Sequence, residues 1–348
     1  MPDNLNLNLN LNLDQNLNLG VGDNRGAGLG PRYNTEDFAK LIPVPFPAAL
    51  TVPTLPYPPN WGPEFRAWAF VHDFIVNGGF TGNDPIKDMI DDIDAQADFP
   101  VPVLTGNELA SEVQIVLHRA IKRPDRAYEI LDQASGPGAL RYWTGLLRID
   151  PLKDKNTWLL ILVARMIGEF VAMGLKDHYK MRRPAQIYPW IMPMIDGPDT
   201  PSFPSSHSLQ AHLISGVLKL ALPETVEAPR VAAGAPPSIK PFLKTPKEIL
   251  DVAAASLSGL AADINKAKDA GAWVTGGKPY PETAKALDVL AYRVATNREV
   301  AGVHYHMDTM AGRYAALICL RVISDRAKAA DPFQTLLADA KKELKDFH

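Results

Sequence analysis

A long apolar run near the middle of the chain, Thr157 to Leu175, restricts what this sequence can fold into. The run carries Arg165 and Glu169, which are spaced i,i+4 and can pair on one face of a helix. A bilayer span would be strongly disfavoured by both charges, so the run predicts a helix buried in a protein core rather than a membrane span.

Helical periodicity recurs along most of the chain, and no alternating strand pattern of any strength is found. Helices are expected over 64–76, 107–135, 140–147, 156–181, 207–222, 247–270, 281–297 and 304–330. The chain has 348 residues, 46% of them hydrophobic, which is enough for a sizeable core. The expected fold class is therefore all-α, a multi-helix bundle with an irregular, proline-rich N-terminal segment over 42–63 and long loops such as 223–246.

Two parts are expected in the chain. Residues 1–36 form a low-complexity arm of Asn-Leu repeats followed by a glycine-rich stretch. The alternation formally suggests a strand, but Asn is a poor strand former, which favours a disordered or loosely docked arm. An added edge strand or a contact in a homo-oligomer is the alternative. Residues 37–348 are expected to form a single helical domain.

Composition excludes several functions. The net charge of -3 gives no general electrostatic reason to bind nucleic acid or an anionic membrane, so any anion site must be local. The one cysteine, Cys319, excludes an intrachain disulfide framework and a cysteine-based zinc site, and is expected to be a buried core thiol. No basic stretch followed by an apolar one is seen near the N-terminus, so neither a secretory signal nor a membrane span is expected. The expected localisation is cytoplasmic or unknown.

Two cations follow the apolar run. Lys176 and Arg183 are seven residues apart, so two helical turns are expected to place them on one face, and Pro184 then ends the helix. They can bind an anion together. The alternative is that they only complement the dipole at the C-terminal end of the helix.

A second segment reads Phe-Pro-Ser-Ser-His before a helix. Ser205 is expected to cap that helix, which leaves the backbone N–H groups at Ser206 and His207 able to face an anion. An ordinary capped helix start is the alternative.

A third segment carries Arg298 and His304 on either side of Gly302. His304 and Asp308 are spaced i,i+4, so the carboxylate can accept from Nδ1 and leave Nε2 as a nucleophile or ligand. His306 has no such partner at i+4 and is expected to have a lining or structural role.

The three segments together resemble the signature of one superfamily: the type 2 phosphatidic acid phosphatases, bacterial acid phosphatases and vanadium-dependent haloperoxidases. The matching residues are Lys176…Arg183-Pro184, Pro204-Ser205-Ser206-His207 and Asn297-Arg298…His304…Asp308. Order and spacing agree over about 130 residues, within an expected catalytic core at about 150–330. Ser206 stands where the pattern has glycine, and Asn297 where it has serine.

The resemblance implies two activities. In a phosphatase acting on a small phosphate ester, Lys176, Arg183 and Arg298 hold the phosphoryl oxygens, helped by Ser205 and the N–H groups at Ser206 and His207. His304, oriented by Asp308, attacks phosphorus, and His207 is the acid and base. No metal or other cofactor is required.

In a vanadium-dependent haloperoxidase, which uses peroxide and a halide, the same cations hold vanadate as cofactor and His304 is its ligand. The compact stretch around Ser205 resembles the phosphatase version more. A non-catalytic anion-binding protein with a degenerate site is the third alternative, because Ser206 and Asn297 depart from the pattern.

Overall fold

The computed structural model describes residues 62–95, 106–134, 138–223, 282–325 and 331–345. In these ranges the chain is mostly helical and contains no strand, which confirms the predicted fold class. The elements are α3 (Pro63–Asn77), η2 (Thr81–Asn83), α4 (Pro85–Asp94), α5 (Asn107–Ala120), α6 (Arg123–Ala134), α7 (Leu140–Leu146), α8 (Lys155–Tyr179), α9 (Pro184–Ile187), η3 (Pro189–Ile191), α10 (Ser206–Ala221), α13 (Glu282–Ala301), α14 (His306–Ser324) and α15 (Pro332–Glu343). The predicted arm over 1–36, nearly all of the segment over 42–63, the loop after Pro223 and the helix over 247–270 lie outside these ranges.

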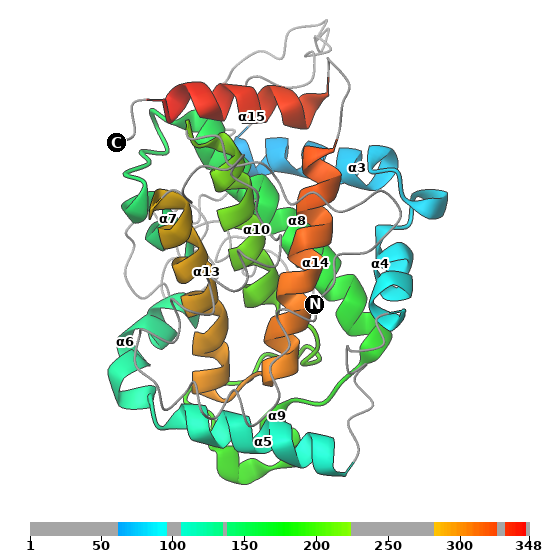
Figure 1. The fold of residues 1–348 in the computed structure, drawn as a ribbon, viewed down its shortest axis with the longest axis vertical. Helices are drawn as coiled ribbons and strands as arrows, with labels where there is room; N and C mark the ends of the chain where they lie inside the picture. The colour runs from blue at the N-terminus through cyan, green and yellow to red at the C-terminus, as the bar shows by residue number, and fades with distance from the viewer. Residues whose placement is uncertain (1–61, 96–105, 135–137, 224–281, 326–330, 346–348) are drawn as a thin grey trace, which may run out of the picture.

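Helix α10 lies at the centre and packs against α8, α13 and α14 (Figure 1). Helices α3 and α15 pack on α8, while α5 and α6 lie against α13 near the opposite end of the bundle. The apolar run forms α8, where Leu159, Ile161 and Ala164 are fully buried. Cys319 is buried in α14, as expected.

Within the described ranges, one helical stretch, Lys155–Ile187, is long and apolar enough to cross a membrane by length and composition. The core helix of a bundle meets the same two criteria, and 67% of the most apolar window of this stretch is buried inside the protein.

The first turn of α8 is capped by a residue far along the chain. The carboxylate of Glu343, at the end of α15, accepts from the backbone N–H and side chain of Asn156 at 3.0 and 2.9 Å. Its other oxygen accepts from the N–H and hydroxyl of Thr157 at 2.7 and 2.8 Å. These bonds satisfy N–H groups that have no acceptor within the helix.

The single helix predicted over 107–135 is wrong, because the structure has two. Helix α5 ends at Ala120 and α6 begins at Arg123. Pro124 falls in the first turn of α6, where its missing N–H is tolerated, whereas inside a continuous helix its ring would clash with the preceding turn. Ile121 continues the apolar periodicity of 107–120 in the sequence, yet it lies in the turn between the helices and is 69% exposed.

The predicted helix face shared by Lys176 and Arg183 is also wrong. Helix α8 ends at Tyr179, because Lys180 adopts a left-handed conformation with φ 50° and ψ 31°. Arg183 precedes α9 with extended backbone, and Pro184 begins that helix rather than ending α8. A proline favours extended backbone in the residue before it and is itself favoured at the first helical position.

Candidate active site

The three segments singled out in the sequence meet where the ends of four helices converge. Helix α8 contributes Lys176 from its last turn, and α13 contributes Arg298 from its last turn. Helix α10 begins there, with Ser205 as its N-cap, and α14 begins there with Asp308 in its first turn. His304 lies in the turn between α13 and α14 and is only 4% exposed.

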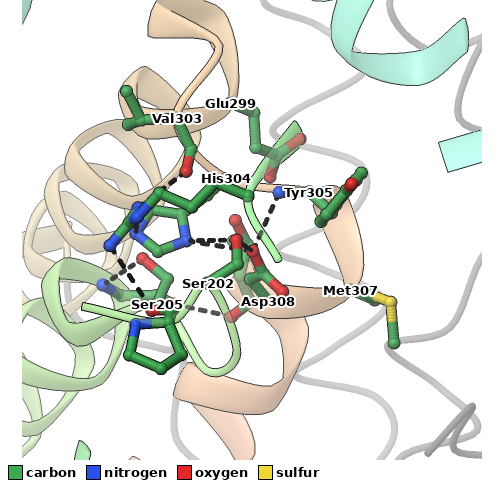
Figure 2. A network of polar contacts seen from close by, with 12 residues as sticks. Ser202, Ser205, Glu299, Val303, His304, Tyr305, Met307 and Asp308 are labelled. Atoms are coloured by element: carbon green, nitrogen blue, oxygen red, sulfur yellow. Dashed lines mark hydrogen bonds and ion pairs between the residues drawn. The ribbon is translucent and has the colours of Figure 1, made fainter. Parts of the chain in front are cut away.

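Both ring nitrogens of His304 have polar contacts (Figure 2). Nδ1 lies 2.9 Å from Oδ2 of Asp308, so the contact predicted from the spacing is confirmed. Nη1 of Arg183 lies 3.3 Å from Nε2. Because a guanidinium only donates, Nε2 is the acceptor and Nδ1 carries the proton. Burial lowers the pKa of His304 to about 4, although Asp308 acts in the opposite direction. The imidazole is therefore neutral near pH 7, and Nε2 keeps its lone pair.

Asp308 joins the turn that contains His304 to the segment that contains Ser202. Its Oδ2 also accepts from the backbone N–H of Tyr305 at 2.9 Å and from Oγ of Ser202 at 2.5 Å (Figure 2). The first contact makes Asp308 part of the capping box of α14, which begins two residues after His304. The contact between His304 and Asp308 therefore spans a turn and a helix start rather than an intact helical turn.

Lys176 is almost completely buried, at 1% exposure. Its Nζ donates to the carbonyl oxygens of Pro201 and Ser202, the latter at 3.0 Å. Burial, followed by the charge of Arg183, lowers the pKa of Lys176 to about 7. A buried ammonium bonded to neutral carbonyls has lost its hydration without gaining a counterion.

The two arginines are also held by backbone carbonyls. Arg183 donates from Nε to Thr200 at 2.8 Å and from Nη1 to Val303 at 2.8 Å. Arg298 donates from Nη2 to the carbonyl of Ile130 at 3.1 Å, and its buried Nε has no hydrogen-bond partner in the described part of the chain. Burial lowers the pKa of Arg298 to about 10, so it stays cationic at neutral pH. Carbonyls orient these cations without neutralising them, which leaves their charge available to an anion.

The start of α10 supplies backbone donors. Ser205 caps the helix, as predicted, because its Oγ accepts from the N–H of Ser208 at 3.3 Å. The first intrahelical bond runs from Leu209 N to Ser205 O at 3.0 Å, so the N–H groups of Ser206 and His207 have no acceptor within the helix. Gly312 of α14 packs against this helix start, and a Cβ there would lie 2.6 Å from the carbonyl oxygen of Ser205.

His207 lies beside the site and is bonded to α6. Its Nε2 lies 3.0 Å from the carbonyl oxygen of Gln133, so Nε2 carries a proton and donates it to that carbonyl. Burial, followed by the charge of Arg298, lowers the pKa of His207 to about 3. The side chain is therefore neutral near pH 7 in this geometry, and its role as an acid stays a prediction.

His306 belongs to a separate buried cluster. Its Nδ1 lies 3.3 Å from both carboxylate oxygens of Glu299, and Glu299 also pairs with Nε of Arg119 at 2.5 Å. Burial raises the pKa of the neighbouring Glu112 to about 7. The contacts of His306 match the structural role predicted for it.

Several residues at the site were not expected from the sequence. Ser202 donates to Asp308, and the carbonyl of Gln133 accepts from His207. Arg123 donates to the carbonyls of Val300 and Met192 at 2.9 and 2.7 Å and so fixes the turn before His304. Backbone acceptors leave no mark in a sequence. The sequence feature that marks this close approach is Gly302 in the turn. A Cβ at this position would lie 2.7 Å from Nη2 of Arg123.

The arrangement can hold a tetrahedral oxyanion against three cationic side chains and present an unprotonated imidazole nitrogen to it. Among the described residues, no group of three or more His, Cys, Asp or Glu side chains is placed to hold a metal ion. Comparison of the chain with protein-family models and with curated proteins finds no match. Membership of the superfamily that the three segments resemble therefore stays a prediction.

Proposed function

We propose that this protein is a phosphomonoester hydrolase of the superfamily that its three segments resemble, working through a phosphohistidine at His304. One observation carries the proposal most directly. Nε2 of His304 is an unprotonated acceptor beside a buried arginine, while Asp308 holds the proton on Nδ1 at 2.9 Å. An imidazole fixed in this tautomer is a nucleophile that needs no further base.

Lys176, Arg183 and Arg298 hold the three phosphoryl oxygens that do not react, with the N–H groups at the start of α10. Their carbonyl contacts fix the side chains in advance, so binding requires little reorganisation. The buried Nε of Arg298 is a donor that lacks a partner in the described part of the chain, and a phosphoryl oxygen would satisfy it.

In the first step the N–H of Arg183 turns from Nε2 of His304 to a phosphoryl oxygen, which frees the lone pair of Nε2. Nε2 then attacks phosphorus, a P–N bond forms and the bond to the ester oxygen breaks. The leaving alkoxide takes a proton from His207. This step requires the imidazolium form, and a bound phosphate dianion favours that form because it offsets the charge of Arg298. In the second step neutral His207 takes a proton from water, the resulting hydroxide attacks phosphorus, and the P–N bond breaks. Phosphate leaves and His304 regains its lone pair.

Vanadate has the charge and shape of phosphate, so the same side chains fit it, with His304 as its ligand. Bound vanadate would supply peroxide activation for halide oxidation. Because both activities use the same residues, an activity assay is needed to distinguish the phosphatase from the haloperoxidase.

The test measures p-nitrophenyl phosphate hydrolysis without added metal. Rapid quenching of the reaction with substrate labelled in its phosphoryl group traps the phosphohistidine enzyme. We expect the wild type to hydrolyse the ester and to carry an alkali-stable, acid-labile label, and we expect His304→Ala to lose both. The matched control is His178→Ala, because His178 is an exposed histidine in the last turn of α8. Hydrolysis by His304→Ala would overturn the proposal. So would halogenation of monochlorodimedone with vanadate, peroxide and bromide in the absence of hydrolysis, or oxyanion binding with neither activity.

A further inference from the structure

Asn297 stands where the superfamily pattern has serine, and its side-chain hydrogen bonds run to a distant part of the sequence. Its side chain is fully buried in α13 and reaches across to α6. Oδ1 accepts from Nη1 of Arg126 at 2.8 Å. Nδ2 donates to Oε2 of Glu129 at 3.0 Å and to Oε1 of Gln133 at 2.9 Å. Each polar atom of the amide therefore has a partner on α6.

The last turns of α6 provide acceptors to two residues of the site. The carbonyl of Ile130 accepts from Arg298 at 3.1 Å, and the carbonyl of Gln133 accepts from His207 at 3.0 Å. Carbonyls at the C-terminal end of a helix form the negative pole of its dipole, so they suit a cation and an N–H donor.

Gln133 links the two sets of contacts. Its side chain bonds Asn297, while its backbone carbonyl bonds His207. Asn297 is also adjacent to Arg298 in α13. A shift of α6 relative to α13 would therefore move the acceptors of Arg298 and His207 at the same time.

We propose that Asn297 is a positioning residue, which fixes α6 against α13 so that the carbonyls of Ile130 and Gln133 hold Arg298 and His207 in place. The meaning of that position for catalysis rests on the proposed function, in which Arg298 binds the phosphoryl group and His207 is the acid. The position itself can be measured without any activity.

A second contact between the same helices provides a matched control. Arg293 pairs with Glu129 through Nε at 2.8 Å and Nη2 at 2.5 Å. The pair is partly exposed, with side chains 30% and 25% accessible. Oε2 of Glu129 accepts from both Arg293 and Asn297, so the pair adjoins the contacts of Asn297. Arg293→Gln removes this ion pair between α6 and α13 but keeps the bonds of Asn297 to α6, so we expect the acceptors of Arg298 and His207 to stay in position.

The experiment follows the tautomer and titration of His207 by long-range proton–nitrogen NMR of protein labelled with ¹⁵N-histidine. The signals are assigned by their loss in His207→Gln. In the wild type we expect the Nε2–H tautomer and a pKa well below the ordinary value of about 6.5. In Asn297→Ser, which places the serine of the superfamily pattern at this position, the shorter side chain cannot reach α6. We expect a mixture of tautomers there, a pKa at least about one unit higher, and a kcat about tenfold lower than wild type.

Two outcomes would overturn the inference. One is a His207 tautomer and pKa in Asn297→Ser that equal those of the wild type, and the other is an equal shift in Arg293→Gln. If Asn297→Ser does not fold, Gln133→Met removes the same side-chain contact but keeps the backbone carbonyl, and the same shift is expected. A wild type that shows the expected NMR signals but hydrolyses no phosphomonoester would refute the proposed function. It would not contradict the positioning role of Asn297.

Discussion

Lys176 gives the site a predicted pH dependence that does not depend on turnover. Its ammonium is bonded to two carbonyls and is 1% exposed, and burial lowers its pKa to about 7. A lysine with a lowered pKa is charged below that value and neutral above it. We therefore expect the affinity for a tetrahedral oxyanion to fall as pH rises through about 7. His304, whose pKa burial lowers to about 4, is neutral throughout this range and does not contribute to the change.

The size of the effect follows from the kind of contact. A hydrogen bond that involves a charged group contributes about 1.5–3 kcal/mol, which corresponds to roughly 10- to 150-fold in affinity. Between pH 6 and pH 9 the wild type is expected to lose affinity by about this factor. Lys176→Met lacks the charge at every pH, so its affinity is expected to be low and to depend less on pH than that of the wild type. Any remaining slope comes from proton uptake by His207 on anion binding, and the wild type should approach the variant at high pH.

Calorimetric titration with sulfate measures the affinity, because sulfate is a monomeric tetrahedral dianion over this whole range and its own protonation does not interfere. Lys180→Met is the matched control: Lys180 is 72% exposed and lies 3.8 Å from Asp177, outside the site. That variant is expected to follow the wild-type curve. A wild-type affinity that stays constant from pH 6 to pH 9 would refute the reasoning. So would a Lys176→Met variant with the same pH dependence as the wild type.

Three further substitutions test other contacts. Asp308→Asn should keep the shape around His304 but lower p-nitrophenyl phosphate turnover at least about tenfold, because a charge-assisted hydrogen bond is roughly twice as strong as a neutral one; unchanged turnover would contradict the orienting role. Gly312→Ala should lower the free energy of unfolding in urea by about 1–3 kcal/mol, because its Cβ meets the carbonyl of Ser205 at 2.6 Å; a change below about 0.5 kcal/mol would show that the helices separate easily. Glu343→Gln should cost about 1–3 kcal/mol in the same assay, because its amide NH₂ must face donors at the start of α8; equal stability would mean that the cap contributes little.

The fold class could be predicted from the sequence because the strongest pattern, helical periodicity, involves residues close together in the chain. A nearly all-apolar run predicts a buried helix, and the structure buries α8 as expected. A helix start could also be predicted where a capping side chain marks it, as at Ser205. The end of α8 could not be predicted, because Lys180 adopts the left-handed conformation, where glycine is the usual residue. The break between α5 and α6 was missed because apolar periodicity continued into the turn at Ile121.

For the site, the sequence predicted side chains but not the backbone that holds them. The contact between His304 and Asp308 follows from their spacing and is present in the structure. The acceptors of Lys176 and Arg183 are main-chain carbonyls, which every residue possesses, so no residue type marks them. The same holds for the role of α6, which reaches the site through the carbonyls of Ile130 and Gln133.

The contact of Glu343 with the start of α8 has a consequence for the order in which the chain can fold during synthesis. Lys176 lies near one end of this helix, and Glu343 caps the other end from 186 residues beyond Thr157. During synthesis the apolar helix is therefore complete long before its capping carboxylate leaves the ribosome. Until then, its first N–H groups have only water or a substitute acceptor. We expect a nascent chain that stops before α15 to hold α8 less firmly, and to be more dependent on chaperones than the finished protein.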